Sequence, residues 1–110
     1  MKDVICVKVR LKPNSLDRVR AWASEINARR AEALETLAKE GVWIESVFLD
    51  RSPEEDYLVY YMRSDSIEQA RTAAIESTAS IDAFHSKFKR EIWIEVRKLE
   101  LLVDLQRTDA

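Results

Sequence analysis

Two strand-like runs decide the fold: Gly41–Leu49 (GVWIESVFL) and Tyr57–Met62 (YLVYYM), joined by the polar stretch 50–56 (DRSPEED). Both runs are rich in aromatic and β-branched residues, which suit a pleated, half-buried surface. The stretch between them contains Pro53 and acidic residues of the kind that favour turns. We therefore predict a β-hairpin at the centre of the chain.

The part of the chain before the hairpin predicts one strand and one long helix. Apolar and polar side chains alternate over residues 4–11, as in a strand with one apolar face. From about Ser15 to Glu40, apolar residues recur every three or four positions, which is the pattern of an amphipathic helix. Asn14 or Ser15 is expected to cap its start, and Gly41 stands where a left-handed cap would end it.

The part after the hairpin predicts two further helices and a last strand. A capping box beginning at Asp65 predicts a helix over Ser66–Glu76. A second helix is expected from Ile81 to about Val96, although the alternation in 92–96 also fits a strand and leaves that alternative open. Residues 99–105 alternate strictly, and we predict them as the fourth strand.

The predicted order is β-α-β-β-α-β, which is the ferredoxin-like arrangement of α+β proteins: a four-stranded antiparallel sheet with helices on one face. The 110 residues are enough for one domain with its own core, so residues 1–110 are expected to form a single domain. The other face of the sheet would then expose aromatic and aliphatic side chains. We expect this face to form a homodimer, sheet packed on sheet.

Composition narrows the function classes. With 18 basic and 20 acidic residues, the net charge of -2 does not favour nucleic acid as a partner. No apolar run approaches the ~20 residues of a membrane span, and the first residues do not form a signal peptide. The only cysteine, Cys6, gives no internal disulfide. We expect a cytoplasmic protein with no membrane partner.

Four segments carry a resemblance to a known group of proteins: 40–50 (EGVWIESVFLD), 57–61 (YLVYY), 81–85 (IDAFH) and 99–105 (LELLVDL). The chain resembles the dimeric α+β barrel superfamily, and within it a small uncharacterised bacterial family, over nearly its whole length. The superfamily includes cofactor-free monooxygenases acting on polycyclic phenols, haem-degrading monooxygenases, sugar mutarotases and stress-related proteins. The resemblance implies a pocket between sheet and helices, and it does not select among these activities.

The comparison with the haem-degrading members is poor. His85 could resemble their histidine ligand, but Ile75 stands where they carry a tryptophan about ten residues earlier. Cys6 and Lys8, rather than an asparagine, stand on the first strand. Haem binding through His85 alone stays open, and no cofactor is expected.

His85 is the candidate catalytic residue. As the only histidine, it is the one side chain that would move a proton near neutral pH without a shifted pKa. It borders an apolar helix stripe and is expected to point toward the sheet. The simpler alternative is a packed histidine without a catalytic role.

Arg30, Trp43 and Tyr60 are the candidate ligand-binding residues. Arg30 interrupts the apolar stripe of the long helix, and a buried charge requires a partner. An internal ion pair with Glu45 or Asp82 is the simpler expectation, and an anionic ligand held by Arg30 is the alternative. Trp43 and Tyr60 lie on the hairpin and combine an aromatic ring with a polar group, as pocket residues often do.

No metal site is expected, because one histidine and one distant cysteine give no ligand cluster. Two hypotheses follow. The first is a small cofactor-independent monooxygenase or isomerase, in which an aromatic or sugar-like substrate occupies the pocket and His85 acts as acid or base. The second is a non-catalytic homodimer that binds a small molecule or serves a structural role.

Overall fold

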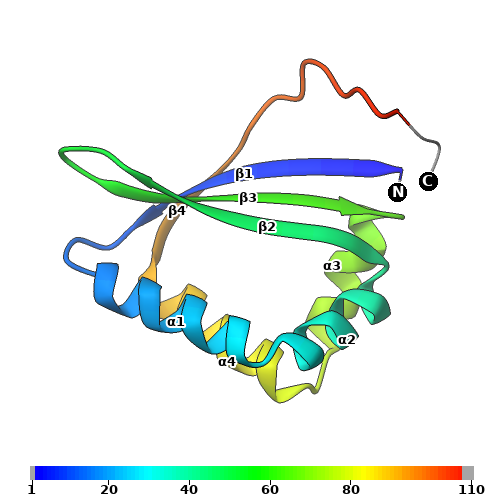
Figure 1. The fold of residues 1–110 in the computed structure, drawn as a ribbon, viewed down its shortest axis with the longest axis horizontal. Coiled ribbons are helices and arrows are strands. Elements are labelled where there is room, and N and C mark those ends of the chain that lie inside the picture. The colour runs from blue at the N-terminus through cyan, green and yellow to red at the C-terminus, as the bar shows by residue number, and fades with distance from the viewer. Residues whose placement is uncertain (1, 108–110) are drawn as a thin grey trace.

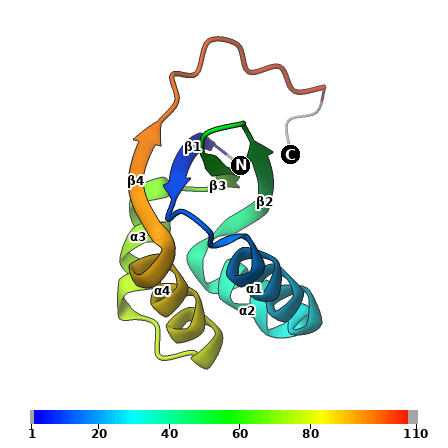
Figure 2. The ribbon, with the colours of Figure 1, turned by 90° about the vertical axis from the view of Figure 1, so that its left-hand side faces the viewer.

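The computed structural model describes residues 2–107 as an antiparallel four-stranded sheet with helices on one face (Figures 1 and 2). The elements follow in the order β1 (Asp3–Leu11), α1 (Leu16–Ala28), α2 (Arg30–Glu40), β2 (Val42–Arg51), β3 (Asp56–Ser64), α3 (Ile67–Glu76), α4 (Ser80–Ile92) and β4 (Trp93–Lys98). Across the sheet the strands lie in the order β2-β3-β1-β4. The predicted ferredoxin-like α+β class is confirmed, with each helical connection made of two helices.

The central hairpin forms where the sequence predicts it. Val47 of β2 lies opposite Tyr60 of β3, and Tyr60 lies opposite Val7 of β1. Because successive side chains of a strand alternate between its faces, this register places all three on the face covered by the helices. The same alternation leaves Phe48 on the open face.

The core lies between the sheet and helices α1 and α4. Its buried members come from β1, β3 and these two helices: Val9, Leu11, Val19, Trp22, Leu58, Tyr60, Phe88 and Ile92. Trp22 stacks on Phe88, with ring centroids 4.6 Å apart. Burial of each large apolar side chain contributes roughly 1.5–3 kcal/mol, so this cluster fixes α1 and α4 against the sheet.

The long helix expected over residues 15–40 is wrong as one element, because it breaks at Arg29. The backbone of Arg29 leaves helical geometry, with φ -103° and ψ 37°, and its guanidinium bonds Glu32 and Ser80. A straight helix of that length would run about 39 Å. This nearly equals the longest extent of the molecule, 41 Å, so the break lets α2 return to the start of β2. Of the helices within residues 2–107, none is long and apolar enough to cross a bilayer.

The helix ends agree with the sequence at Gly41 and differ at Asp65. Gly41 caps α2 in the left-handed conformation, with φ 70°, as predicted. The expected cap at Asp65 is wrong by one residue, because the Ser66 hydroxyl accepts the backbone N–H of Gln69. Asp65 instead accepts a hydrogen bond from the indole of Trp43, at 2.8 Å.

The C-terminal part departs most from expectation. Helix α4 ends at Ile92, and the strand alternative for the following residues is the correct one, since Trp93–Lys98 forms β4 beside β1. The fourth strand predicted over 99–105 is wrong. Leu99–Arg107, called the tail below, has no regular structure and crosses over the open face of the sheet (Figure 1). Pairing with β1 decides this, because Val96 lies opposite Val9.

Candidate functional site

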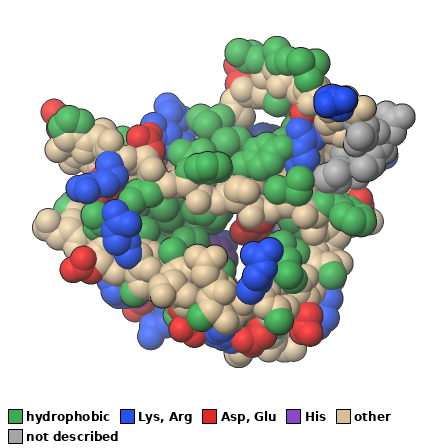
Figure 3. Space-filling view, viewed as in Figure 1, with side chains coloured by type: hydrophobic (Ala, Val, Ile, Leu, Met, Phe, Trp, Pro, Cys, Tyr) green, Lys and Arg blue, Asp and Glu red, His purple; other side chains and the backbone are tan. Residues whose placement is uncertain are grey.

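A cavity of about 460 Å³ lies between the sheet and the helices. Figure 3 shows the corresponding hollow, with histidine at its base and hydrophobic side chains around it. Its volume falls within the range of ordinary small-molecule pockets, roughly 300–1,000 Å³. One wall carries the aromatic rings of Trp22, Tyr60, His85 and Trp93.

His85, from α4, lies in this cavity wall. The indole N–H of Trp22 donates to its Nδ1 at 3.2 Å, and the two rings stack with centroids 5.5 Å apart. Burial, together with the smaller effect of the positive charge of Lys89, lowers the pKa of His85 to about 4. The imidazole is therefore neutral near pH 7, and because Nδ1 accepts, its proton is on Nε2.

Tyr60, the central residue of β3, also lines the cavity. Only 7% of its surface is exposed, and its hydroxyl has no hydrogen-bond partner among the described residues. The Trp93 Nε1 is likewise buried and without a partner there. Burial, and then the charge of Glu45, raise the pKa of Tyr60 well above its usual value; the nearby Trp93 N–H opposes this shift without forming a hydrogen bond of good geometry. Two buried donors thus lie beside the cavity without a hydrogen bond of good geometry among the described residues.

Three carboxyl groups line the cavity: Glu40 at the end of α2, Glu45 on β2 and Asp82 on α4. Burial raises the pKa of Glu40 to about 7, with smaller contributions from the charges of Asp82 and Glu45, while Lys89 opposes them. Burial also raises the pKa of Glu45, against Lys89. Although Glu45 is exposed by surface area, protein encloses it on most sides, because the surface that it presents is the cavity wall.

These carboxyl groups were missed as site residues by sequence reasoning, which considered Glu45 and Asp82 only as ion-pair partners. A usable signal was present at Glu45. It stands two residues before Val47 in a strand whose alternate side chains face the helices, so it had to point inward. No comparable pattern marks Glu40.

Arg30 lines the cavity but is not buried, so the predicted buried charge is wrong. Within residues 2–107 it forms no ion pair, and the expected pair with Glu45 or Asp82 is absent from this part of the chain. The physical reason is the break at Arg29, which ends one helical register and begins another.

Trp43 does not line this cavity, so the expectation that it lies in the pocket is wrong. The register between β2 and β3 shifts between Val42 and Ile44, so Trp43 is the extra residue of an irregularity. Its indole is 63% exposed and bonds Asp65 outside the cavity. The structure therefore brings together His85, Tyr60 and Arg30 of the four predicted site residues.

In the described part of the chain, no three His, Cys, Asp or Glu side chains are placed so that they could hold a metal ion together. Instead, the cavity combines neutral donors with carboxyl groups whose pKa values are raised. This combination suits the binding of a hydroxyl-bearing ligand and the acceptance of a proton from it.

The fold and cavity define a ferredoxin-like α+β protein with a pocket between sheet and helices. The chain belongs to a family of unknown function, DUF6176, which matches residues 2–110. No match was found among the curated proteins.

Solved structures share the fold at low sequence identity. A protein of Bacteroides thetaiotaomicron provisionally named an antibiotic biosynthesis monooxygenase is 13% identical, with a TM-score of 0.56 over 97% of this chain and 93% of that one. The de novo designed protein Ferredog-Diesel is 13% identical, with a TM-score of 0.53 over 91% and 87%. A Pseudomonas aeruginosa protein, PA3566, is 14% identical, with a TM-score of 0.50 over 91% and 93%. At these identities the likeness shows the fold alone.

Proposed function

We propose that the protein binds a small aromatic compound with an acidic hydroxyl group in the sheet–helix cavity and removes the hydroxyl proton. The observation that carries this proposal is the meeting of unpartnered buried donors with a carboxyl group of pKa about 7. The aromatic rings of Trp22, Tyr60 and Trp93 favour a flat ligand over a sugar.

Glu40 is the proposed proton acceptor. A general base works best when its pKa lies near the working pH, and Glu40 satisfies this condition where His85 does not. His85 keeps a role as a hydrogen-bond donor through Nε2, and Tyr60 donates to a developing phenolate oxygen. Arg30, at the cavity wall, serves to attract an anionic ligand group.

Proton removal leaves an electron-rich anion. This deprotonation is a first step that a cofactor-independent monooxygenase and an isomerase have in common. The monooxygenase name of one structural neighbour agrees with the first of these activities. We therefore propose a cofactor-independent monooxygenase, or an isomerase, of phenolic substrates, acting in the cytoplasm. No part of this proposal requires a metal or a bound cofactor.

Glu40→Gln tests the proposed base. Binding of hydroxylated naphthalenes and anthrones is measured by quenching of tryptophan fluorescence, and turnover by oxygen consumption and product analysis. We expect Glu40→Gln to keep binding and to lower turnover by about 10²-fold or more, the usual contribution of a general base. Glu35→Gln is the matched control, because Glu35 lies on the same helix and is exposed. Equal turnover in both variants would exclude Glu40 as the base.

A non-catalytic ligand carrier is the second candidate, and it is favoured by the neutral, hydrogen-bonded state of His85. Binding without turnover by any phenol or isomerisable substrate would support it. Failure of every phenol to bind would contradict both candidates.

We also propose that the protein is a homodimer formed through the open face of the sheet. The exposure of Phe48, at 62%, supports this proposal, because large aromatic side chains on an open sheet form the kind of apolar surface that marks an interface. Light scattering on the purified chain tests it directly.

A further inference from the structure

The tail carries the most exposed aliphatic side chains of the described chain. Leu102 is 81% exposed and Leu105 is 88% exposed, and Leu101 and Val103 beside them are exposed at 58% and 71%. Figure 3 shows these hydrophobic side chains standing above the sheet, on the side opposite the helices. Such a cluster loses favourable burial unless something covers it.

The tail is nevertheless held in place at both ends. The backbone N–H of Leu99 donates to the Cys6 carbonyl oxygen of β1 at 2.9 Å. Further along, Asp104 forms an ion pair and hydrogen bonds with Arg63, which projects from the open face of β3 and also bonds Tyr61. The exposed aliphatic side chains are therefore presented in a fixed position over the sheet.

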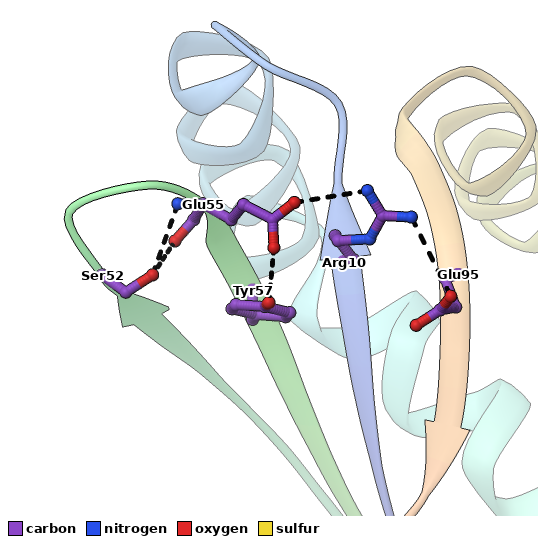
Figure 4. A network of polar contacts seen from close by, with 5 residues as sticks. All are labelled: Arg10, Ser52, Glu55, Tyr57 and Glu95. Atoms are coloured by element: carbon purple, nitrogen blue, oxygen red, sulfur yellow. Dashed lines mark hydrogen bonds and ion pairs between the residues drawn. The ribbon is translucent and has the colours of Figure 1, made fainter.

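The open face beneath the tail is suited to contact with an identical face, because three of its basic side chains, Lys8, Arg10 and Arg63, are paired with acids within the chain. Lys8 bonds Asp50 at 3.0 Å. Figure 4 shows Arg10 between Glu55 and Glu95, at 3.3 and 3.9 Å. Charges that are already compensated do not repel a second copy of the same surface.

We propose that the tail forms part of the dimer interface, with Leu102 and Leu105 of each copy packed against the open face and tail of a second copy. This inference rests on the proposed homodimer and assigns it a specific segment. A second copy is favoured over other occupants because this chain carries both halves of the contact, the aliphatic tail and the open sheet face with exposed Phe48. A membrane surface is disfavoured, because three neighbouring basic side chains, Lys8, Arg10 and Arg63, are already paired with acids.

The proposal further places each tail on its own sheet, so that Asp104 meets Arg63 of the same copy within the dimer, as it does in the chain described here. The alternative is an exchange, in which the two tails cross to the opposite copy. Because the Arg63–Asp104 pair would then form between copies, charge reversal distinguishes the two arrangements.

The first test is the double variant Leu102→Asp/Leu105→Asp, studied by sedimentation equilibrium from micromolar to near-millimolar concentration. We expect its dimer dissociation constant to rise about tenfold or more over that of the unaltered chain, since burial of even one leucine is worth that factor. Ile75→Asp is the matched control, because Ile75 is 79% exposed but lies on α3 in the helix layer. Circular dichroism verifies folding of each variant.

Every outcome of this test decides something. A monomeric unaltered chain overturns both the homodimer and the role of the tail. If the unaltered chain is a dimer and the leucine variant weakens it no more than Ile75→Asp does, the homodimer stands and the role of the tail is overturned. Selective weakening by the leucine variant supports the proposal.

The second test mixes Arg63→Asp with Asp104→Arg. If tails stay on their own sheets, each chain keeps one repulsive pair, and mixing restores no dimer stability. If tails are exchanged, the mixed dimer contains two attractive pairs, and mixing restores the unaltered dissociation constant. That restoration would overturn the assignment of each tail to its own sheet. The double variant Arg63→Asp/Asp104→Arg is the control and should dimerise in either case.

Discussion

Acidification will destabilise the protein through His85. The side chain is enclosed by Trp22 and neighbouring rings, so the folded protein resists protonation of the imidazole, whereas the unfolded chain does not. The relevant pKa falls from an ordinary 6.5 to about 4 on folding. Below pH ~6.5 the unfolded state binds more protons than the folded one, so stability falls as pH falls, until the folded state also protonates near its own pKa.

The size of this effect follows from the two pKa values. Between about pH 7.5 and about pH 5, linkage gives a loss of about 2 kcal/mol from this one group. Glu40 acts in the opposite direction over part of the same range. Because its pKa is raised to about 7 in the folded state, the folded protein takes up that proton before the unfolded chain does, and stability rises as pH falls toward ~4.5. The total pH dependence therefore mixes two opposed contributions.

His85→Gln separates the two contributions. Glutamine does not titrate, its carbonyl oxygen can still accept the Trp22 N–H, and Glu40 is unchanged in the variant. Urea unfolding is followed by tryptophan fluorescence for both proteins across this pH range. We expect the free energy of unfolding of the variant to fall by about 2 kcal/mol less than that of the unaltered chain.

Parallel curves for the two proteins would refute the reasoning. They would show that the His85 imidazole titrates at its ordinary pKa in the folded state, and hence that water fills the cavity around it. The chain contains one histidine, so a tag-free preparation has no other imidazole that could mimic the effect. The NMR titration of the His85 ring gives the same pKa independently.

Three further outcomes are expected. Tyr60→Phe should leave the free energy of unfolding unchanged or raise it by up to about 1 kcal/mol, because the buried hydroxyl lacks a partner, yet it should weaken binding of a phenol; urea titration and fluorescence quenching measure the two effects. Gly41→Ala should cost about 1–2 kcal/mol in urea unfolding, since its φ of 70° is unfavourable for alanine. Lys89→Met should raise the pKa values of both His85 and Glu40, because the positive charge of Lys89 lowers each of them. NMR titration measures both pKa values, and an unchanged value for either residue would contradict this prediction.

The centre of the fold was predictable because local and long-range signals agree there. Alternation in β1 and in both hairpin strands fixes which side chains face the helices, and the pairing of Val7, Tyr60 and Val47 follows that pattern. Gly41 was predictable for the same reason, since a single glycine stood between a helical period and a strand period.

The C-terminal strand was not predictable in this way. Residues 92–96 and 99–105 both alternate, so periodicity alone could not say which of them joins the sheet. Contacts between residues far apart in sequence determine which segment joins the sheet. The Lys12 N–H bonds the Ile92 carbonyl oxygen, and this places the residues that follow Ile92 beside the edge of β1. A strand beginning at Trp93 uses that edge at once. The leucine-rich tail is then left over the open face.

The candidate site shows the same division. His85 and Tyr60 could be selected from the sequence, because His85 borders an apolar helix stripe and Tyr60 lies on the hairpin and combines an aromatic ring with a polar group. Arg30 was misread as buried, because the apolar stripe gives no sign of the break at Arg29. The proposed proton acceptor, Glu40, stands near the end of a helix where an acidic residue is unremarkable, and only the folded chain shows its enclosure.

The polar groups of the cavity are better explained by a ligand than by the fold. An unpartnered buried hydroxyl and a carboxyl group with a raised pKa each lower stability, and the architecture does not require them. A designed protein with no natural substrate shares this architecture, which shows that the sheet and helices can form without a history of selection for binding. The unfavourable groups here converge from β3, β4 and α2 on one cavity. Because the fold alone does not require these groups to meet in one cavity, their convergence is a physical argument for the proposed binding role.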